Sequence, residues 1–178
     1  MVFYSVGHSN RSLEDFLGLL QSQGIRALAD VRAFPSSRKY PHFGRGPLAR
    51  ALEGVGIVYR WLGDSLGGYR REGLGRASPN TAWVSVGFRN YADHMLTPEF
   101  RRGMERLLWM GKRWRTAFMC AERFWWRCHR RFIADWLVAH GHRVIHILDP
   151  GKLMDHRLPP FAEVRGDHVV YPDQGELA

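Results

Sequence analysis

The two cysteines of this 178-residue chain lie in one twelve-residue segment, together with a carboxylate, an imidazole and four guanidinium groups. The segment runs from Cys120 to Arg131 and contains Glu122, Cys128 and His129. Nearby arginines stabilise a thiol in its thiolate form, which is the nucleophilic form. We therefore predict three catalytic groups. Cys120 is the expected nucleophile or polar anchor, and Glu122 and His129 are the expected proton-transfer groups.

Two other kinds of cysteine chemistry are less well supported by the spacing. Cysteine phosphatases place an arginine six positions after the cysteine, but Trp126 and Ala134 occupy those positions here. Zinc or iron would accept Cys120, Cys128 and His129 as ligands. However, no Cys-x-x-Cys pair is present, and the surrounding arginines repel cations. We predict no metal ligands in the site, and metal binding stays an alternative.

Apolar strands alternate with amphipathic helices along the chain, and this pattern predicts the framework around the cysteines. Such alternation is typical of βαβ units with right-handed crossovers and a mostly parallel sheet. We predict an α/β fold: a single doubly wound, mostly parallel sheet of about five strands, with helices on both faces. One domain should span residues 1–178, with an irregular tail from about residue 150 that contains one hairpin. The expected strands are residues 2–6, 25–31, 57–62, 115–120 and 144–148.

Polar residues follow several of the expected strands. In parallel sheets, ligands bind beyond the carboxyl ends of the strands, so these residues should converge on one edge. Arg32, Arg38 and Arg130 would hold an anion there through charge-assisted hydrogen bonds. A glycine-rich stretch at 63–80 is expected to form a long loop, and loops of this length are usually functional or mobile. The predicted ligand-binding residues are His8, Ser9, Asp30, Arg32, Ser37, Arg38 and Arg130.

Composition points to an anionic ligand. The net charge is +9, and arginine supplies almost all of the 26 basic residues. Arginine binds phosphate in a bidentate manner and stacks on flat rings, and aromatic residues make up 13% of the chain. We expect a phosphorylated small molecule or nucleic acid as partner. No apolar run approaches the roughly 20 residues of a membrane span, so we expect a cytoplasmic protein without membrane contact.

Several motifs, in order from about residue 3 to 148, resemble the DUF488 family of prokaryotic proteins. The resemblance implies a small α/β domain with a shared polar site, and it names no reaction. The Phe124-Trp125-Trp126 stretch departs from the family pattern between the two cysteines. The motifs that carry the resemblance are Gly7-His8-Ser9-Asn10, Asp30-Val31-Arg32, Pro35-Ser36-Ser37-Arg38, His42-Phe43, Leu66-Gly67-Gly68, Phe88-Arg89-Asn90-Tyr91-Ala92 and Cys120-Ala121-Glu122 with Cys128-His129-Arg130.

The convergence of polar groups at strand ends favours an enzyme that acts on a phosphorylated, nucleotide or nucleic-acid substrate in a crevice at that edge. A nucleic-acid-binding module without catalysis is the first alternative, because charge and aromatic residues alone account for such binding. A metal-binding protein that uses Cys120, Cys128 and His129 is the second. The sequence gives no indication of a cofactor or of the oligomeric state.

Overall fold

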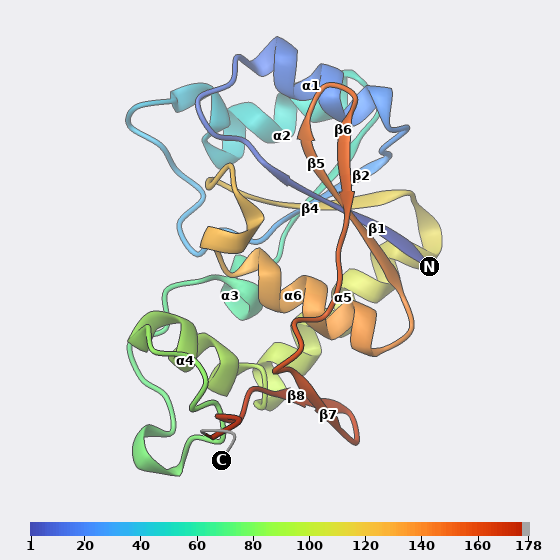
Figure 1. Ribbon diagram of the computed structural model, residues 1–178. Coiled ribbons are helices and arrows are strands. Elements are labelled where there is room, and N and C mark those ends of the chain that lie inside the picture. Colours follow the sequence, from blue (N-terminus) through green and yellow to red (C-terminus); the bar gives the residue numbers. More distant parts are fainter. Residues whose placement is uncertain (176–178) are drawn as a thin grey trace.

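A six-stranded sheet forms the centre of the computed structural model, which describes residues 1–175 (Figure 1). The strand order is β3-β2-β4-β1-β5-β6; β6 runs antiparallel to β5, and the other pairs are parallel. The expected α/β class with a mostly parallel sheet is confirmed, with six strands rather than about five. The doubly wound arrangement stays a prediction. The strands are β1 (Val2–Gly7), β2 (Ala27–Asp30), β3 (Val58–Trp61), β4 (Thr116–Cys120), β5 (Arg143–Asp149) and β6 (Lys152–Asp155).

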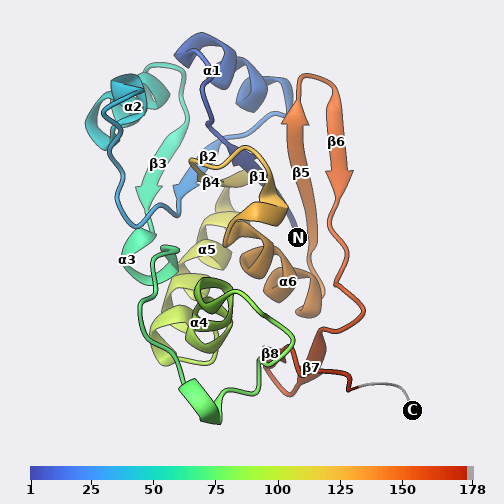
Figure 2. The same ribbon diagram turned by 60° about the vertical axis from the view of Figure 1, so that its left-hand side comes forward.

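Helices cover both faces of the sheet (Figure 2). Helices α1 and α2 bury Phe16 and Leu48 against one face, and α5 and α6 bury Leu107 and Phe132 against the other. These helices have one apolar side each, as expected for helices that pack on a sheet. The helices are α1 (Leu13–Ser22), α2 (Arg45–Gly54), α3 (Gly63–Leu66), α4 (Val86–His94), α5 (Pro98–Arg113) and α6 (Arg130–Ala139), with short 3₁₀ turns η1 (Pro41–Phe43), η2 (Gly75–Ala77) and η3 (Trp125–Arg127).

The central strands end at the same level. Gly7 at the end of β1 pairs with Cys120 at the end of β4, and Asp30 at the end of β2 pairs with Met119. Residues that follow these three strands therefore emerge side by side at one edge of the sheet. A Cβ on Gly7 would overlap the Glu122 carbonyl, so glycine is needed where the loop after β4 crosses the end of β1.

The glycine-rich stretch expected to be a loop is largely irregular, with only α3 and η2 as short helical turns. Its conformation is fixed by one carboxylate, because Asp93 on α4 accepts hydrogen bonds from three of its donors. These are the Leu74 backbone N–H at 2.9 Å, the Ser78 hydroxyl at 2.5 Å and the Asn80 amide at 2.8 Å. The stretch is therefore tied to α4 rather than loosely attached.

The C-terminal part contains more structure than the irregular tail that we expected. The hairpin is present as β7 (Glu163–Arg165) and β8 (His168–Val170), but β6 was missed. All four residues of β6 are exposed, so the strand lacks the apolar pattern that reveals one. Residues 176–178 of the expected tail lie outside the described residues. Within residues 1–175, no helix combines the length and apolar character needed to cross a membrane.

Candidate functional site

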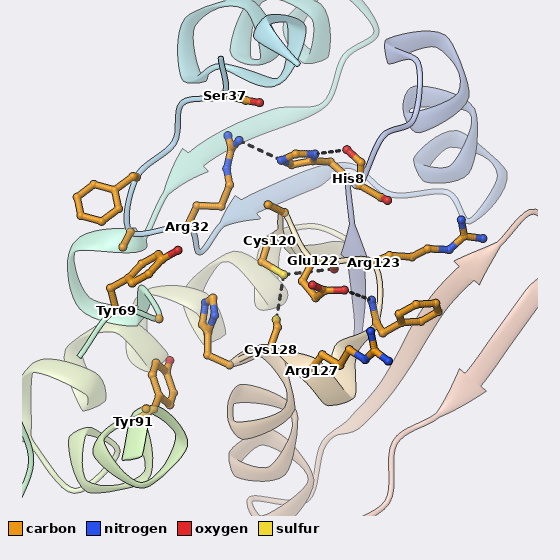
Figure 3. Close-up of a pocket in the computed structure, with 18 of the residues that line it drawn as sticks. His8, Arg32, Ser37, Tyr69, Tyr91, Cys120, Glu122, Arg123, Arg127 and Cys128 are labelled. Carbon is orange, nitrogen blue, oxygen red and sulfur yellow. Dashed lines mark hydrogen bonds between the residues drawn. The ribbon is translucent and has the colours of Figure 1, made fainter. Parts of the chain in front are cut away.

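A cavity of about 1080 Å³ opens at the carboxyl ends of β1, β2 and β4 (Figure 3). Its lining comes from the segments after these strands, from residues 68–71, and from the start of α4. This is the edge at which the sequence places a ligand site. Seven predicted site residues line it: His8, Ser9, Arg32, Ser37, Cys120, Glu122 and His129.

The remaining three predicted residues do not line the cavity. Asp30 and Arg130 are buried beneath it, at 0% and 1% exposure. Arg38 is exposed on the loop after β2 and lies outside the lining, so its predicted role as an anion ligand is not supported by its position. The loop has no regular period that could tell which side chain faces inward. Lys39, its neighbour, lines the cavity instead.

The two thiols lie together at the floor of the cavity. The Sγ atoms of Cys120 and Cys128 are 3.0 Å apart, and both residues are buried. Cys128 also lines the cavity and is slightly more exposed than Cys120. The turn η3 brings the chain back so that Cys128 stands just before α6, opposite the end of β4.

Arg130 holds both sulfurs. Its Nε donates to the Cys120 sulfur at 3.0 Å, and its backbone N–H donates to the Cys128 sulfur at 3.2 Å. Its Nη2 donates to the Glu122 carbonyl oxygen at 2.6 Å, which fixes the loop after β4. A buried guanidinium needs such partners, because an uncompensated buried charge is costly. Arg130 is therefore a structural support of the thiol pair rather than a free anion ligand.

The surroundings of the two thiols shift their pKa values in opposite directions, upward for Cys120 and downward for Cys128. Burial raises the pKa of the Cys120 thiol well above its ordinary value, and the hydrogen bond to Cys128 adds to this. Burial also opposes charge on Cys128. There, however, the hydrogen bond from Cys120 together with the Arg130 guanidinium and backbone N–H outweighs burial and lowers the pKa to about 6. Cys128 is thus the thiolate and Cys120 the thiol.

Behind Arg130, a chain of buried hydrogen bonds runs from β1 to β5 and to the segment after β6, and it ends on α6. Arg130 Nη1 donates to Ser5 Oγ at 2.8 Å, and Ser5 Oγ lies 2.8 Å from Nδ1 of His146. Nε2 of His146 lies 2.8 Å from Nδ1 of His156, whose Nε2 lies 2.5 Å from the Asp135 carboxylate. With Asp135 ionised and both imidazoles neutral, each hydrogen bond has one donor and one acceptor only if every donor points toward Asp135. We name these four residues, Ser5, His146, His156 and Asp135, the buried relay.

The sequence contains only partial signals of the buried relay. Ser5 and His146 lie inside apolar strands that are buried on both faces, where a polar side chain needs a partner. His156 follows β6, in the part expected to be irregular, so the pairing was not foreseen. Trp125 stacks on His146 with ring centroids 4.4 Å apart. The aromatic stretch between the two cysteines therefore packs against the buried relay. Burial lowers the pKa of His146 far below its ordinary value, and this keeps the imidazole neutral.

A second ion pair lies on the β2 side of the cavity. Arg32 binds Asp30 in a bidentate manner at 2.9 and 2.7 Å, and Tyr59 donates its hydroxyl to the same carboxylate at 2.5 Å. His8 donates from Nδ1 to the Ser9 carbonyl at 2.9 Å and accepts from Arg32 at 3.4 Å through Nε2. Burial, reinforced by the Arg32 charge, lowers the pKa of His8 to about 4. His8 is therefore neutral at pH 7.

The two predicted proton-transfer groups, His129 and Glu122, differ in burial and in how firmly their side chains are held. His129 donates from Nε2 to the Val31 carbonyl at 2.9 Å, which leaves Nδ1 as the unprotonated nitrogen. Burial lowers the pKa of His129, so the ring is neutral. A Cβ on Gly68 would lie 2.7 Å from that Nδ1 atom, so only glycine fits beside it. Glu122 is exposed, and its carboxylate accepts the Phe124 backbone N–H at 3.3 Å.

Cations surround the mouth of the cavity. Among them, the sequence predicted a ligand-binding role only for Arg32. Arg70 and Arg123 form ion pairs with Glu99 and Asp149, respectively. Three others, which we name the free rim cations, make no ion pair within residues 1–175: Lys39, Arg71 and Arg127. The sequence signal for the arginines among these cations was the presence of several arginines in the glycine-rich stretch and between the two cysteines.

Aromatic rings lie beside these cations. Phe34 and Tyr69 are 68% and 79% exposed, and their ring centroids are 5.5 Å apart at the cavity mouth. The two rings are tilted by 49° to each other, so each presents its own exposed face, and such faces can stack on a nucleotide base. The metal alternative gains no comparable support. Among the described residues, no group of three or more His, Cys, Asp or Glu side chains is placed to hold a metal ion.

Comparison with known proteins identifies the family of the chain. Neither the curated proteins nor the solved structures contain a match to this chain. A family model described as "Domain of unknown function DUF488" matches residues 12–137, which include α1 through most of α6 and both cysteines. Because this match covers well over half of the 178 residues, the chain belongs to the DUF488 family.

Proposed function

We propose that the protein is an enzyme that acts on a phosphorylated, nucleotide or nucleic-acid substrate bound in the cavity, with a cysteine thiolate at the cavity floor as its nucleophile. The observation that carries this proposal is a thiol pair held by Arg130 at the floor of a cavity lined by cations. A nucleophile and an anion-binding surface in one cavity are the two parts that such a reaction needs.

Cys128 replaces Cys120 as the proposed nucleophile. Its sulfur accepts the Arg130 backbone N–H at the start of α6, where the helix dipole favours negative charge. The Cys120 thiol instead has hydrogen-bond acceptors in the Cys128 sulfur and, at 3.5 Å, the Glu122 carbonyl. Cys120 then keeps its proton and supports the charge on its neighbour.

The other groups divide between substrate binding and proton transfer. The free rim cations would contact phosphate oxygens, and Phe34 with Tyr69 would stack on a base. His129 presents an unprotonated Nδ1 that can take up a proton, and the exposed Glu122 carboxylate is the second proton-transfer group. Both roles are the ones assigned from sequence.

Site-resolved alkylation tests the proposal. Wild-type protein is treated with iodoacetamide at a series of pH values, and the labelled peptide is identified. We expect Cys128 to react first, with a midpoint near pH 6. At low salt, a short single-stranded oligonucleotide, a nucleoside triphosphate or pyrophosphate should slow the reaction. A midpoint near the roughly 8.5 of an ordinary thiol, or no protection by any of these anions, overturns the proposal.

The exposed pair Phe34 and Tyr69 also supports the second candidate, a nucleic-acid-binding module without catalysis. Such a module needs the stacking surface and the cations, but not the thiolate. The same experiment separates the two candidates. Oligonucleotide binding that weakens steeply with salt, combined with an ordinary thiol midpoint, would favour binding alone.

A further inference from the structure

The arrangement of the two sulfurs suits a reaction that the proposed function does not require. Their Sγ atoms are 3.0 Å apart in the thiol state, while a disulfide bond is about 2.05 Å long. Closing the bond therefore needs a movement of only about 1 Å. Cys120 ends β4 and Cys128 follows η3, so the two sulfurs come from different elements that meet at the cavity floor.

The two thiols also differ in the way that reversible oxidation needs. Cys128 carries the charge and is the more exposed, at 8% against 3% for Cys120, so a small oxidant reaches it first. Cys120 lies directly behind it and holds a proton. A reactive thiolate with a second thiol next to it forms a disulfide before further oxidation can occur.

We propose that Cys120 and Cys128 are a redox-active pair that reacts with hydroperoxides and closes a reversible disulfide at the cavity floor. The Cys128 sulfur attacks one peroxide oxygen, the O–O bond breaks, and the departing alkoxide or hydroxide takes a proton from solvent. Cys128 is then a sulfenic acid. The Cys120 sulfur attacks the Cys128 sulfur, the S–O bond breaks, and the hydroxyl leaves as water with the Cys120 proton. The peroxide is reduced to an alcohol or water, and the two thiols are oxidised.

Arg130 makes this oxidation reversible. Its guanidinium and its backbone N–H hydrogen-bond to the two sulfurs of the reduced pair, and the charge attraction disappears when the thiolate becomes part of a disulfide. Interactions that stabilise the thiolate favour the reduced form, so a dithiol should reopen the bond readily. The pair's redox chemistry stands independently of the proposed substrate. If the proposed function also holds, the oxidised protein lacks its nucleophile and is inactive.

Intact mass and thiol counting test the redox pair in the full-length protein. Reduced wild-type protein receives stoichiometric hydrogen peroxide or tert-butyl hydroperoxide, and free thiols are then counted in denaturant. We expect both thiols to disappear, the monomer mass to fall by two hydrogens, and dithiothreitol to restore both. Persistence of both thiols, a sulfinic acid, or a disulfide between two chains overturns the proposal.

Matched single variants assign the two roles. In Cys120→Ser the sulfenic acid at Cys128 cannot be resolved, and dimedone should trap it there. In Cys128→Ser the remaining Cys120 thiol should survive the same treatment. Equal reactivity of the two variants contradicts the assigned order. Because the substrate and the rim cations play no part in these measurements, their outcome is separate from that of the alkylation test.

Discussion

Charged groups lie on both sides of the thiol pair, and the two sides use charge differently. On the cavity side, Lys39, Arg71 and Arg127 reach solvent and make no ion pair within residues 1–175. On the buried side, the Arg130 guanidinium is connected to the Asp135 carboxylate through hydrogen bonds of the buried relay. Exposed charges can move to meet a ligand, whereas buried charges are fixed by the partners that compensate them.

This difference assigns separate tasks to the two sides. The buried side sets the ionisation of the thiols, because any displacement of Arg130 changes what the sulfurs contact. The cavity side determines which molecule approaches them. Substitutions on the buried side should therefore change stability and thiol reactivity, while substitutions of the free rim cations should change ligand binding alone.

The largest effect is expected from the acidic end of the buried relay. Asp135 accepts hydrogen bonds from His156 at 2.5 Å and from the Tyr171 hydroxyl at 2.6 Å, and it is 1% exposed. Asp135→Ala leaves these two buried donors without an acceptor, and each unsatisfied buried donor costs about 1–3 kcal/mol. We expect a loss of about 3–5 kcal/mol in the free energy of unfolding, measured by urea titration.

A surface carboxylate provides the matched control. Asp149 accepts from Arg123 at 2.7 Å, but it is partly exposed, and ion pairs of this kind contribute under about 1 kcal/mol. If Asp135→Ala is too unstable to purify, Asp135→Asn keeps one acceptor oxygen and should fall between the two. Equal losses for Asp135→Ala and Asp149→Ala would show that the buried donors His156 and Tyr171 do not depend on Asp135.

The next effect is a dependence of stability on pH that comes from Cys128. Its pKa is about 6 in the folded protein, below the roughly 8.5 of an ordinary thiol, which applies in the unfolded chain. Between these pH values the unfolded chain binds one more proton at this site. The stabilisation is therefore lost as pH falls toward 6 and grows as pH rises, at about 1.4 kcal/mol per pH unit.

Comparison with Cys128→Ser isolates this contribution, because the histidines of lowered pKa are present in both proteins. The stability difference between wild type and Cys128→Ser should widen steadily when urea titrations are repeated between pH 6.5 and 8.5. Cys120, whose pKa is raised, opposes this trend only above its ordinary range. Parallel stability curves for the two proteins would place the negative charge elsewhere than on Cys128.

The sequence predicted the framework well, because local patterns determine it. The five apolar segments expected to be strands correspond to β1 to β5, and Thr97 caps α5 with Pro98 in its first turn. The convergence of His8, Arg32 and Cys120 on one cavity also follows from strand ends. Ligand sites in parallel sheets lie beyond the carboxyl ends of the strands, and this placement depends on topology rather than on side-chain contacts. A single sequence was therefore sufficient to predict it.

What the sequence could not predict depends on contacts between distant residues. Ser5 and His146 are 141 positions apart, and nothing local connects them. The choice between Cys120 and Cys128 as thiolate depends on which atoms of Arg130 face each sulfur, and spacing does not encode this. The exposed strand β6 and the inward position of Lys39 were missed for a similar reason, because neither has a periodic pattern.

The smallest effect on stability, and the most specific effect on binding, is expected at the rim. Arg71→Gln removes one free rim cation from an exposed position, so the free energy of unfolding should change by less than about 0.5 kcal/mol. Protection of Cys128 by a single-stranded oligonucleotide should weaken, and the dependence of binding on salt should fall by about 0.7 in the log–log slope. Arg26→Gln is the control, because Arg26 is equally exposed but precedes β2, at the opposite edge of the sheet. If both substitutions weaken protection equally, the net charge of the protein attracts the ligand. The free rim cations would then have no specific role in ligand binding, contrary to the task assigned to the cavity side.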